Sequence, residues 1–353
     1  MTKMNAAMFY APRDVRFERI DIPSPGPGEL LVKIGAALTC GTDIKTYERG
    51  HPVIIKKVPS TFGHEFSGQV VGVGKGATNF MEGDRVTCCN AVPCGECYYC
   101  KIGHRNLCEN LLILNGAYAE YIVIPERLVR FNTYKISETT TYQEAAVSEP
   151  LGTAIHCVRH AGIRQGDTVV VLGSGPLGLM ICRLAHLQGA RVILSGEITE
   201  GRKNVAEKFG VNEFINILEV KDSKERIQLV KDKTFSGKGA DVAIEAAGFP
   251  EAWEEAIQMV RGAGTVVFHG GCKAGTSITL DTHDMHYLEH KLIGVFHQDP
   301  EDYRRSVQML SSRLVDGREF VSETLPLNQL ITAFERVRRF EGIKFAIDPS
   351  VME

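Results

Sequence analysis

The sequence predicts an α/β protein in which a β-rich first part precedes a doubly wound parallel sheet. Short apolar runs separated by Gly and Pro fill roughly the first 150 residues, which is typical of a barrel or a sandwich. Nearly continuous apolar strands then alternate with segments of helical length, which indicates a parallel sheet covered on both faces. The length of 353 residues corresponds to about two domains at roughly 150 residues each.

The individual elements follow from these patterns in chain order. In the first part, strands are expected over residues 29–34, 69–74 and 119–124. In the second part, an apolar strand at 167–172 precedes a helix at 177–187. Further strands are expected at 191–195, 241–246, 264–268 and 291–295. The chain beyond residue 296 has a helical pattern and ends in a strand at 343–347.

Composition excludes several classes of protein. Hydrophobic residues make up 44% and charged residues 24% of the chain, which is ordinary globular usage and argues against disorder or a coiled coil. The formal net charge of -3 gives no electrostatic reason to expect a nucleic acid or an anionic membrane as partner. No apolar stretch of about 18 residues and no signal-peptide core is present, so we expect a cytoplasmic protein.

A glycine-rich segment directly after the strand at 167–172 predicts a dinucleotide site. It fits G-x-G-x-x-G between a strand and a helix, where the glycines allow a tight turn and close approach of a pyrophosphate. The helix N-terminus adds N–H donors. Glu197 follows the next strand at about the expected 20 residues. The alternative is a glycine-rich turn of another α/β protein. The segment consists of Gly173, Ser174, Gly175, Pro176, Leu177 and Gly178.

Four cysteines within fifteen residues predict a metal site. Cys94, Cys97, Cys100 and Cys108 supply four thiolates, which can close a tetrahedral zinc site and leave no open position for chemistry. In a long chain without a signal peptide, such spacing indicates metal rather than disulfides. An iron–sulfur cluster is the rival because it also takes four cysteines. Four free buried cysteines are the third alternative.

Three other segments are individually weak. Cys40 precedes Thr42 and Asp43, His64 precedes Glu65, and Glu149 lies just before the nucleotide domain. Alone, His64 is more often a core or surface histidine, and Glu149 resembles a helix-start carboxylate. Together they offer sulfur, nitrogen and oxygen ligands, a set suited to an open catalytic zinc site.

The ordered set of motifs resembles the zinc-containing medium-chain dehydrogenase/reductases, and most of all their polyol (sorbitol-type) and threonine dehydrogenase branch. The resemblance runs from about residue 5 to the end of the chain. It rests on Cys40-Gly41-Thr42-Asp43, Gly63-His64-Glu65, Gly83-Asp84-Arg85-Val86, the four-cysteine lobe, Glu149-Pro150 and the glycine-rich segment.

The resemblance implies a fold and an activity. A GroES-like β-barrel catalytic domain would occupy residues 1–154, with a structural zinc lobe at 88–110. A Rossmann domain would occupy 155–295, and residues 296–353 would return to the catalytic domain. The implied enzyme is zinc-dependent and transfers a hydride between a nicotinamide cofactor and a secondary alcohol or ketone, such as a polyol, a sugar derivative or threonine. Two zinc ions per chain and a homodimer or homotetramer are also implied.

The resemblance further assigns roles to residues. Cys40, His64 and Glu149 would bind the catalytic zinc, and Glu65 would bind it directly or sit next to it. Asp43 would orient His64. Thr42 would hydrogen-bond the substrate hydroxyl and begin a proton relay. Substrate pockets are expected near Tyr47, Arg49 and Tyr118.

Two positions depart from the family pattern. Lys45 stands where relatives often have a relay histidine; it would hold an anionic substrate group or remain an exposed lysine, with His51 as a substitute relay. Gly196 stands where many NAD-using relatives have Asp, followed by Glu197, with Arg202 nearby. Because a carboxylate there accepts bonds from the ribose hydroxyls and repels a 2′-phosphate, we expect NAD, with NADP as the alternative.

Two rival functions remain at this point. The first is a superfamily reductase that keeps the fold without the catalytic zinc, and the second is a zinc or iron–sulfur binding protein that senses a nucleotide. Measuring the metal content of the protein tests the first alternative. For the second, an absorbance spectrum distinguishes an iron–sulfur cluster from zinc.

Overall fold

The structure is a computed structural model that describes residues 2–51 and 54–352. The chain forms two compact units. Unit 1 comprises Met1–Gly152 and Gln298–Glu353, and unit 2 comprises Thr153–His297. The first boundary falls inside helix α5 (Ser148–Ala161).

Unit 1 is built on two sheets. The larger has the order β10-β6-β5-β3-β18-β17, with β9 also paired to β3, and the smaller has the order β2-β1-β4. The strands of unit 1, with those of a small hairpin, are β1 (Lys3–Ala11), β2 (Asp14–Asp21), β3 (Leu30–Leu38), β4 (Ser60–Thr61), β5 (Phe66–Val73), β6 (Arg85–Cys88), β7 (Ala91–Val92), β8 (Leu112–Ile113), β9 (Tyr121–Ile124), β10 (Thr133–Lys135), β17 (Val321–Pro326) and β18 (Lys344–Asp348).

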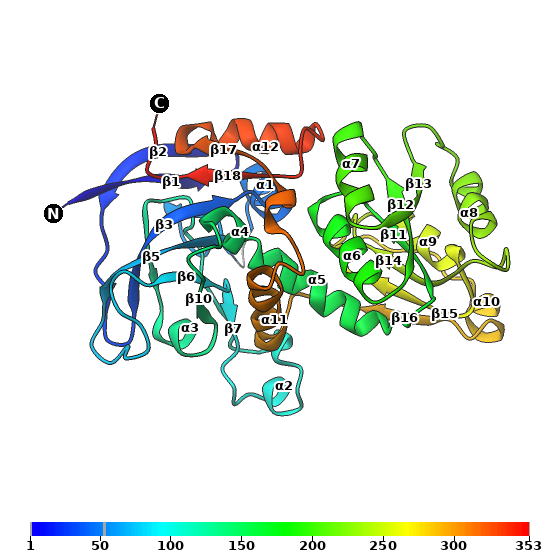
Figure 1. Ribbon diagram of the computed structural model, residues 1–353, viewed down its shortest axis with the longest axis horizontal. Coiled ribbons are helices and arrows are strands. Elements are labelled where there is room, and N and C mark those ends of the chain that lie inside the picture. The colour runs from blue at the N-terminus through cyan, green and yellow to red at the C-terminus, as the bar shows by residue number, and fades with distance from the viewer. Residues whose placement is uncertain (1, 52–53, 353) are drawn as a thin grey trace. The chain divides into compact units, whose positions relative to one another are not determined.

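Short helices surround these sheets. They are α1 (Gly41–Arg49), α2 (Tyr98–Lys101), α3 (Glu126–Phe131), α4 (Tyr142–Ala146), α11 (Pro300–Ser311) and α12 (Leu330–Arg338), with 3₁₀ turns at Arg105–Leu107, Gly317–Phe320 and Leu327–Gln329. The last strand, β18, lies beside β3 near the start of the chain, so segments at opposite ends of the sequence share one sheet (Figure 1). The strand expected at 343–347 is therefore present, whereas β17 was not expected.

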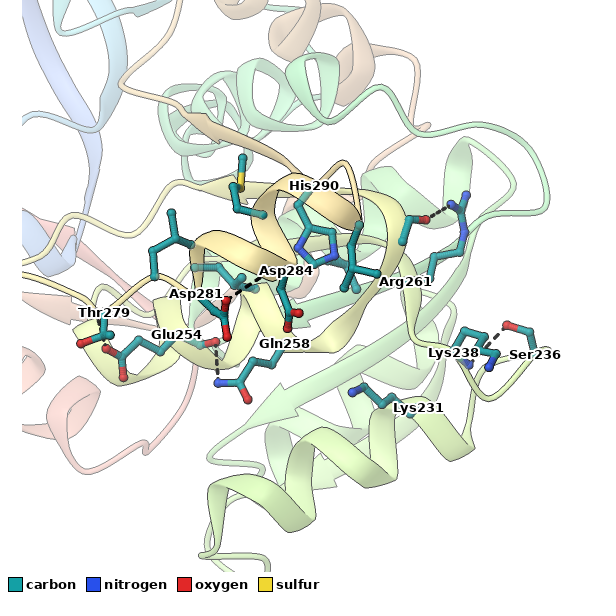
Figure 2. A pocket seen from close by; sticks show the side chains of 16 residues that line it. Lys231, Ser236, Lys238, Glu254, Gln258, Arg261, Thr279, Asp281, Asp284 and His290 are labelled. Atoms are coloured by element: carbon teal, nitrogen blue, oxygen red, sulfur yellow. Dashed lines mark hydrogen bonds between the residues drawn. The ribbon is translucent and has the colours of Figure 1, made fainter.

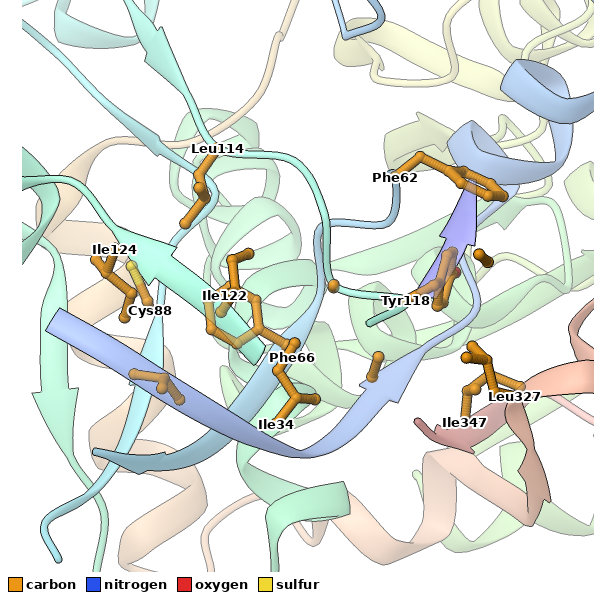
Figure 3. Packing of buried hydrophobic residues seen from close by; sticks show 14 of the residues in the cluster. Ile34, Phe62, Phe66, Cys88, Leu114, Tyr118, Ile122, Ile124, Leu327 and Ile347 are labelled. Atoms are coloured by element: carbon orange, nitrogen blue, oxygen red, sulfur yellow. The ribbon is translucent and has the colours of Figure 1, made fainter. Parts of the chain in front are cut away.

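The core of unit 1 lies between its sheets and helix α12. Phe62 and Tyr118 are fully buried and meet edge to face, with ring centroids 5.1 Å apart (Figure 3). Gly63, with φ of 93°, follows Phe62, and a Cβ at Gly63 would lie 2.6 Å from the Tyr118 ring. Only glycine therefore lets the chain turn here and deliver His64 beside the core.

Unit 2 is a six-stranded parallel sheet with the order β13-β12-β11-β14-β15-β16. Numbered along the chain, this is 3-2-1-4-5-6, the order of doubly wound dinucleotide-binding folds. The predicted parallel sheet is thus present. The elements are β11 (Thr168–Leu172), α6 (Pro176–Leu187), β12 (Arg191–Gly196), α7 (Glu200–Lys208), β13 (Val211–Asn216), α8 (Ser223–Asp232), β14 (Ala240–Glu245), α9 (Pro250–Met259), β15 (Val260–Phe268), α10 (Thr282–Tyr287) and β16 (Lys291–Gly294).

The edge strand β13 was not expected. Its residues Val211–Asn216 include Asn212, Glu213 and Asn216, so the apolar run that marks the central strands is missing. Within the described ranges of the chain, no helix has both the length and the apolar character that crossing a membrane requires.

Candidate functional site

The N-terminus of α1 presents Cys40. This residue caps the helix in an extended conformation, and its sulfur accepts the N–H of Thr42 at 3.5 Å. Thr42 is half-buried in the first turn, Asp43 is buried, and Lys45 points to solvent. The short sequence Cys40–Asp43 therefore places a sulfur, a hydroxyl and a carboxylate at one end of a helix.

His64 is buried and oriented by Asp43. The Nδ1 atom of His64 lies 2.9 Å from Oδ1 of Asp43, and the Tyr118 hydroxyl lies 2.7 Å from Oδ2 of the same carboxylate. Burial opposes a charge on His64, but the charges of Asp43 and Cys40 outweigh it and hold the pKa of the imidazole well above its ordinary value. With Nδ1 engaged by Asp43, Nε2 is the ring nitrogen left to bind a metal.

Glu65 forms a buried ion pair with Lys344. The Lys344 Nζ atom lies 2.7 Å from Oε2 and 3.0 Å from Oε1 of Glu65, and both side chains are at most 2% exposed. Burial raises the pKa of the Glu65 carboxyl group, and Lys344 opposes that rise. Since β18 carries Lys344 and Glu65 immediately precedes β5, the pair ties two strands of the larger sheet together.

Glu149 is held by Gln298. The Gln298 Nε2 atom lies 3.0 Å from Oε1 of Glu149 and 3.1 Å from its carbonyl oxygen. Burial raises the pKa of the Glu149 carboxyl group to about 7, and the charges of His64 and Glu65 also act on it. Glu149 therefore lies within electrostatic reach of His64 and Glu65.

Three of these side chains fit a metal ion. One ligand atom each from Cys40, His64 and Glu65 lies within 4.8 Å of the other two, while Glu149 is not part of that group. A sulfur, a nitrogen and an oxygen are ligands that zinc accepts, and three protein ligands leave a position open. The donor set therefore suits a catalytic zinc.

The four predicted cysteines converge in a second cluster. Cys94, Cys97, Cys100 and Cys108 all bring their sulfurs within 4.8 Å of one another. The sulfurs of Cys94 and Cys100 are 4.0 Å apart, and those of Cys97 and Cys108 are 3.9 Å apart. Four thiolates at about 2.3 Å from one tetrahedral ion would lie about 3.8 Å apart. The spacing fits a single ion, since a cluster of several iron atoms needs more room.

Backbone N–H groups point at these sulfurs. The Cys94 and Asn110 amides donate to the Cys108 sulfur at 3.2 and 3.3 Å, and the Cys97 amide donates to Cys94 at 3.3 Å. Backbone N–H donation, led by that of Cys100, lowers the pKa of the Cys97 thiol to about 6. Backbone N–H donation also lowers the pKa of Cys94, whereas burial raises the pKa of Cys100 to about 12 and raises that of Cys108. The turn therefore favours the thiolate, the form that binds metal, at Cys94 and Cys97.

The glycine-rich turn of unit 2 joins β11 to α6. Gly173 has φ of 115°, and a Cβ at Gly178 would lie 1.9 Å from the Gly173 carbonyl oxygen. A Cβ at Gly175, the N-cap of α6, would meet nothing within 4 Å, and Pro176 occupies the first helical turn. The first glycine thus makes the turn, the third allows close packing, and the second leaves the backbone open to a pyrophosphate.

Glu197 and Arg202 lie beside this turn. The Ser174 hydroxyl donates to the Glu197 carbonyl oxygen at 2.6 Å, and Arg202 Nη1 lies 3.3 Å from that hydroxyl. Partial burial raises the pKa of Glu197. The ribose-binding candidate Glu197 and the buried Arg202 are therefore both adjacent to the predicted phosphate-binding loop.

Known proteins share both units. Residues 26–132 match the family described as "Alcohol dehydrogenase GroES-like domain", and residues 176–312 match "Zinc-binding dehydrogenase". A D-xylulose reductase A of Aspergillus niger is 34% identical over 94% of this chain and 93% of its own. The sorbitol dehydrogenase of Bacillus subtilis is 31% identical over 98% of both chains.

This chain belongs to the zinc-containing medium-chain dehydrogenases. A structure described as a putative zinc-binding dehydrogenase of Sinorhizobium meliloti, bound to NADP, has a TM-score of 0.88 at 28% identity and covers 99% of this chain and 100% of its own. The predicted family, the α/β fold with a GroES-like part, and the predicted class, a zinc-type alcohol or polyol oxidoreductase, are confirmed.

Sequence reasoning missed several residues of the enzyme that support the site. Lys344 lies in an apolar strand, Gln298 in a connecting segment, and neither is part of a motif. Tyr118, which was expected near the substrate pocket, is fully buried, and its hydroxyl donates to Asp43. The glycine before His64 was the available signal, since the Tyr118 ring occupies the space that a Cβ at Gly63 would need.

A separate cavity of about 740 Å³ opens in unit 2 (Figure 2). Its lining includes Lys238, Val260 and Gly262, which lie just before or at the start of strands β14 and β15. The cavity is therefore at the amino edge of the sheet, whereas the glycine-rich turn is at the carboxyl edge. Since open parallel sheets bind ligands outside the carboxyl ends of their strands, this cavity is not the dinucleotide site.

Proposed function

We propose that this enzyme oxidises a secondary alcohol of a polyol, with a nicotinamide dinucleotide as hydride acceptor, and catalyses the reverse reduction of the ketone. The observation that best supports this proposal is that Cys40, His64 and Glu65 each bring a ligand atom within 4.8 Å of the other two. They do so in the same unit as the four-cysteine lobe. The names of the D-xylulose and sorbitol enzymes support a polyol as substrate. Sugar derivatives and hydroxy amino acids such as threonine belong to the same chemical class.

The catalytic zinc would be held by Cys40, His64 and either Glu65 or Glu149. When bound, zinc supplies Lewis-acid chemistry that lowers the pKa of an alcohol. Asp43 keeps His64 in the tautomer that leaves Nε2 free for a metal, because its carboxylate accepts a hydrogen bond from the Nδ1–H group. Lys344 pairs with Glu65 and opposes the effect of burial, which raises the pKa of the Glu65 carboxyl group.

Other residues would serve proton transfer, substrate binding and hydride transfer. Thr42, two residues beyond Cys40, would accept the hydrogen bond of the substrate hydroxyl and pass its proton toward solvent. Lys45, exposed on the next turn, lies on the solvent side of α1 and would contact an anionic group of the substrate. The glycine-rich turn would hold the dinucleotide, which would supply the hydride acceptor.

A second zinc would occupy the lobe of Cys94, Cys97, Cys100 and Cys108. All four positions of a tetrahedral ion would be filled by protein, so this zinc would stabilise the lobe without taking part in the reaction. Metal analysis of the purified enzyme should give two zinc ions per chain. A value near one in a fully active preparation would remove one of the two sites.

NAD is the proposed cofactor, in preference to NADP. Glu197 lies at the end of β12, where its carboxylate can accept hydrogen bonds from the ribose hydroxyls and would repel a 2′-phosphate. Arg202 has the opposite charge, but it is only 3% exposed and its guanidinium is directed at Ser174. The ratio of kcat/KM for the two cofactors tests this, and a preference for NADP would show that Arg202 serves a phosphate.

A homodimer or homotetramer is also proposed. Strand β16 is the last strand of the unit 2 sheet, and Lys291 and Gly294 at its two ends are exposed. Pairing with the same strand of a second copy would satisfy an otherwise open edge. Light scattering at micromolar concentration tests this proposal, and a monomer would contradict it.

The experiment that tests the function is a substrate panel. Polyols, polyol phosphates, threonine and simple secondary alcohols are each incubated with the enzyme and NAD, and NADH formation is followed. We expect turnover with at least one polyol and none after the metal is removed by a chelator. Turnover that survives removal of all zinc would contradict the proposed chemistry.

A further inference from the structure

Glu245 is a buried carboxyl group at the carboxyl edge of the unit 2 sheet. It ends β14 and pairs in register with Leu172 of β11 on one side and Phe268 of β15 on the other. Its side chain is fully buried. The carboxyl edge is where the glycine-rich turn begins, so Glu245 lies between the strands that lead into the dinucleotide site.

The carboxyl group joins the loop after its own strand to the loop after β15. Its Oε1 atom accepts the N–H groups of Ala247 and Gly248 at 2.8 and 2.6 Å. Its Oε2 atom would lie 2.5 Å from a Cβ at Gly270, and hydrogen bonding from the Trp253 side chain and the Gly270 backbone acts to lower the pKa of the carboxyl group. Only a glycine at 270 leaves room for this carboxyl group.

The backbone of the loop after β14 packs against the glycine-rich turn. A Cβ at Gly173 would lie 3.1 Å from both the carbonyl carbon of Ala246 and the amide nitrogen of Ala247. The loop that Glu245 holds is therefore in direct contact with the first glycine of the phosphate-binding turn. Any side chain at position 173 would crowd this loop, so glycine there is what allows the two segments to pack closely.

We propose that Glu245 is a positioning residue for the dinucleotide, because it holds the loops after β14 and β15 against the glycine-rich turn as one binding surface. This inference rests on the proposed cofactor site and adds a residue that does not itself touch the cofactor. Burial is the main cause that raises the pKa of Glu245 to about 7, against the opposing hydrogen bonds from Gly248 and Ala247. Its protonation therefore changes in the neutral range.

Two neighbouring titratable groups, Cys157 and His269, stay neutral in that range. Cys157 on α5 has its thiol pKa raised, first by burial and then by the charge of Glu245. His269, whose N–H donates to the Glu245 carbonyl oxygen, has its pKa lowered to about 4, mainly by burial. Of these three groups, Glu245 alone changes charge between pH 6 and pH 8.5.

The sign of the pH effect follows from charge. The dinucleotide is an anion, so its binding disfavours the ionised form of Glu245 and raises the pKa above 7. Affinity is then greatest below the pKa of the free protein and falls as pH rises toward the pKa of the complex. Each pH unit of that rise weakens binding about tenfold.

The single tryptophan reports on this cluster. Trp253 donates its Nε1 hydrogen to the Gly270 carbonyl oxygen at 3.2 Å and stacks on Phe268 with centroids 4.1 Å apart. Titration of the full-length enzyme with NADH, followed by quenching of Trp253, gives the affinity at each pH. The variants are Glu245→Gln and Glu245→Ala. The matched control is Glu254→Gln, on the same helix as Trp253, because this carboxylate also accepts a backbone N–H, that of Thr279, at its Oε1 atom.

We expect the wild-type Kd for NADH to rise about tenfold from pH 6 to pH 8.5. Glu245→Gln keeps the Oε1 acceptor, so it should bind as the wild type does at pH 6 and lose the pH dependence. Glu245→Ala should bind at least tenfold more weakly at both pH values, and Glu254→Gln should match the wild type. A Glu245→Gln variant that keeps the wild-type pH profile would overturn the inference alone. Absence of NADH binding by the wild type would instead overturn the cofactor site.

Discussion

Unit 1 holds two clusters of side chains that could bind a metal ion, and the two differ in ligand type, spacing and burial. The cysteine lobe uses four identical ligands from one stretch of fifteen residues, and half of them are partly open to solvent. The other cluster takes sulfur, nitrogen and oxygen from Cys40, His64 and Glu65, and its His64 and Glu65 are buried. Four short-range thiolates make a closed site, whereas three mixed ligands leave a place for substrate.

The two clusters also differ in what surrounds them. Backbone amides satisfy the lobe sulfurs, so the lobe carries its own support. The buried cluster depends on side chains from distant segments, namely Asp43, Tyr118 and Lys344. A closed site therefore needs only local sequence, while an open one needs the surrounding fold to hold its ligands and balance their charge.

We expect His64→Ala to cause the largest loss of activity among these variants. Loss of the imidazole removes one of the proposed ligands of the catalytic zinc, and Lewis-acid stabilisation is worth several kcal/mol. We expect kcat to fall roughly 10³-fold or more, with the fold and NADH binding retained. Steady-state kinetics, circular dichroism and NADH titration measure these quantities. Normal turnover by this variant would contradict the assignment of Cys40 and His64 to catalysis.

Lys344→Met tests the dependence on distant side chains. It leaves the Glu65 carboxylate buried without its partner, which costs about 3–5 kcal/mol when a buried pair is broken. Denaturant unfolding of the two forms should show a loss of this size. The matched control is Lys3→Met, whose pair with Asp21 is about half exposed; its loss should change stability by less than about 1 kcal/mol. Equal effects of the two variants would show that burial of the Lys344 pair is immaterial.

Asp43→Asn tests the orientation of His64. The amide cannot take the charge-assisted hydrogen bond at Nδ1, so zinc should be bound about 10–100-fold more weakly. The rate of zinc transfer to a chromophoric chelator measures the change. Asp21→Asn, at the surface of the same unit, serves as the control. If wild type and Asp43→Asn transferred zinc at the same slow rate, Asp43 would not be needed to orient His64 for metal binding.

Cys97→Ser should have the smallest effect on turnover. The lobe would lose its zinc, so metal content should fall from two ions per chain to one and the melting temperature should drop by about 5 °C or more. We expect kcat of the chains that remain folded to stay within about threefold of wild type, because the lobe lies outside the reaction. A drop as large as that of His64→Ala would mean that the lobe is part of the catalytic machinery.

The same contrast explains how far the sequence predicts the molecule. Ligands in short motifs, such as Cys94–Cys108 and the glycine-rich segment, are predictable because geometry constrains neighbouring residues. Lys344 is not, because its partner lies 279 positions earlier and a lone lysine in an apolar strand has no pattern. The central strands were predicted from apolar runs, but the edge strands β13 and β17 were missed because their exposed faces are polar.

The position of β18 between β3 and β17 has a consequence for biosynthesis. Unit 2 is one continuous stretch, whereas the sheet of unit 1 is interrupted until residues 344–348 arrive. About 190 residues separate Gly152 from Lys344, which corresponds to roughly 10–40 s of translation at about 5–20 residues per second. Ribosome-bound chains that end before Lys344, but are long enough for all of unit 2 to have left the ribosome, should therefore show a protease-resistant unit 2 and a protease-sensitive unit 1. For that interval the nascent chain carries Glu65 without its counter-ion, so the catalytic unit is the last part of the enzyme to mature.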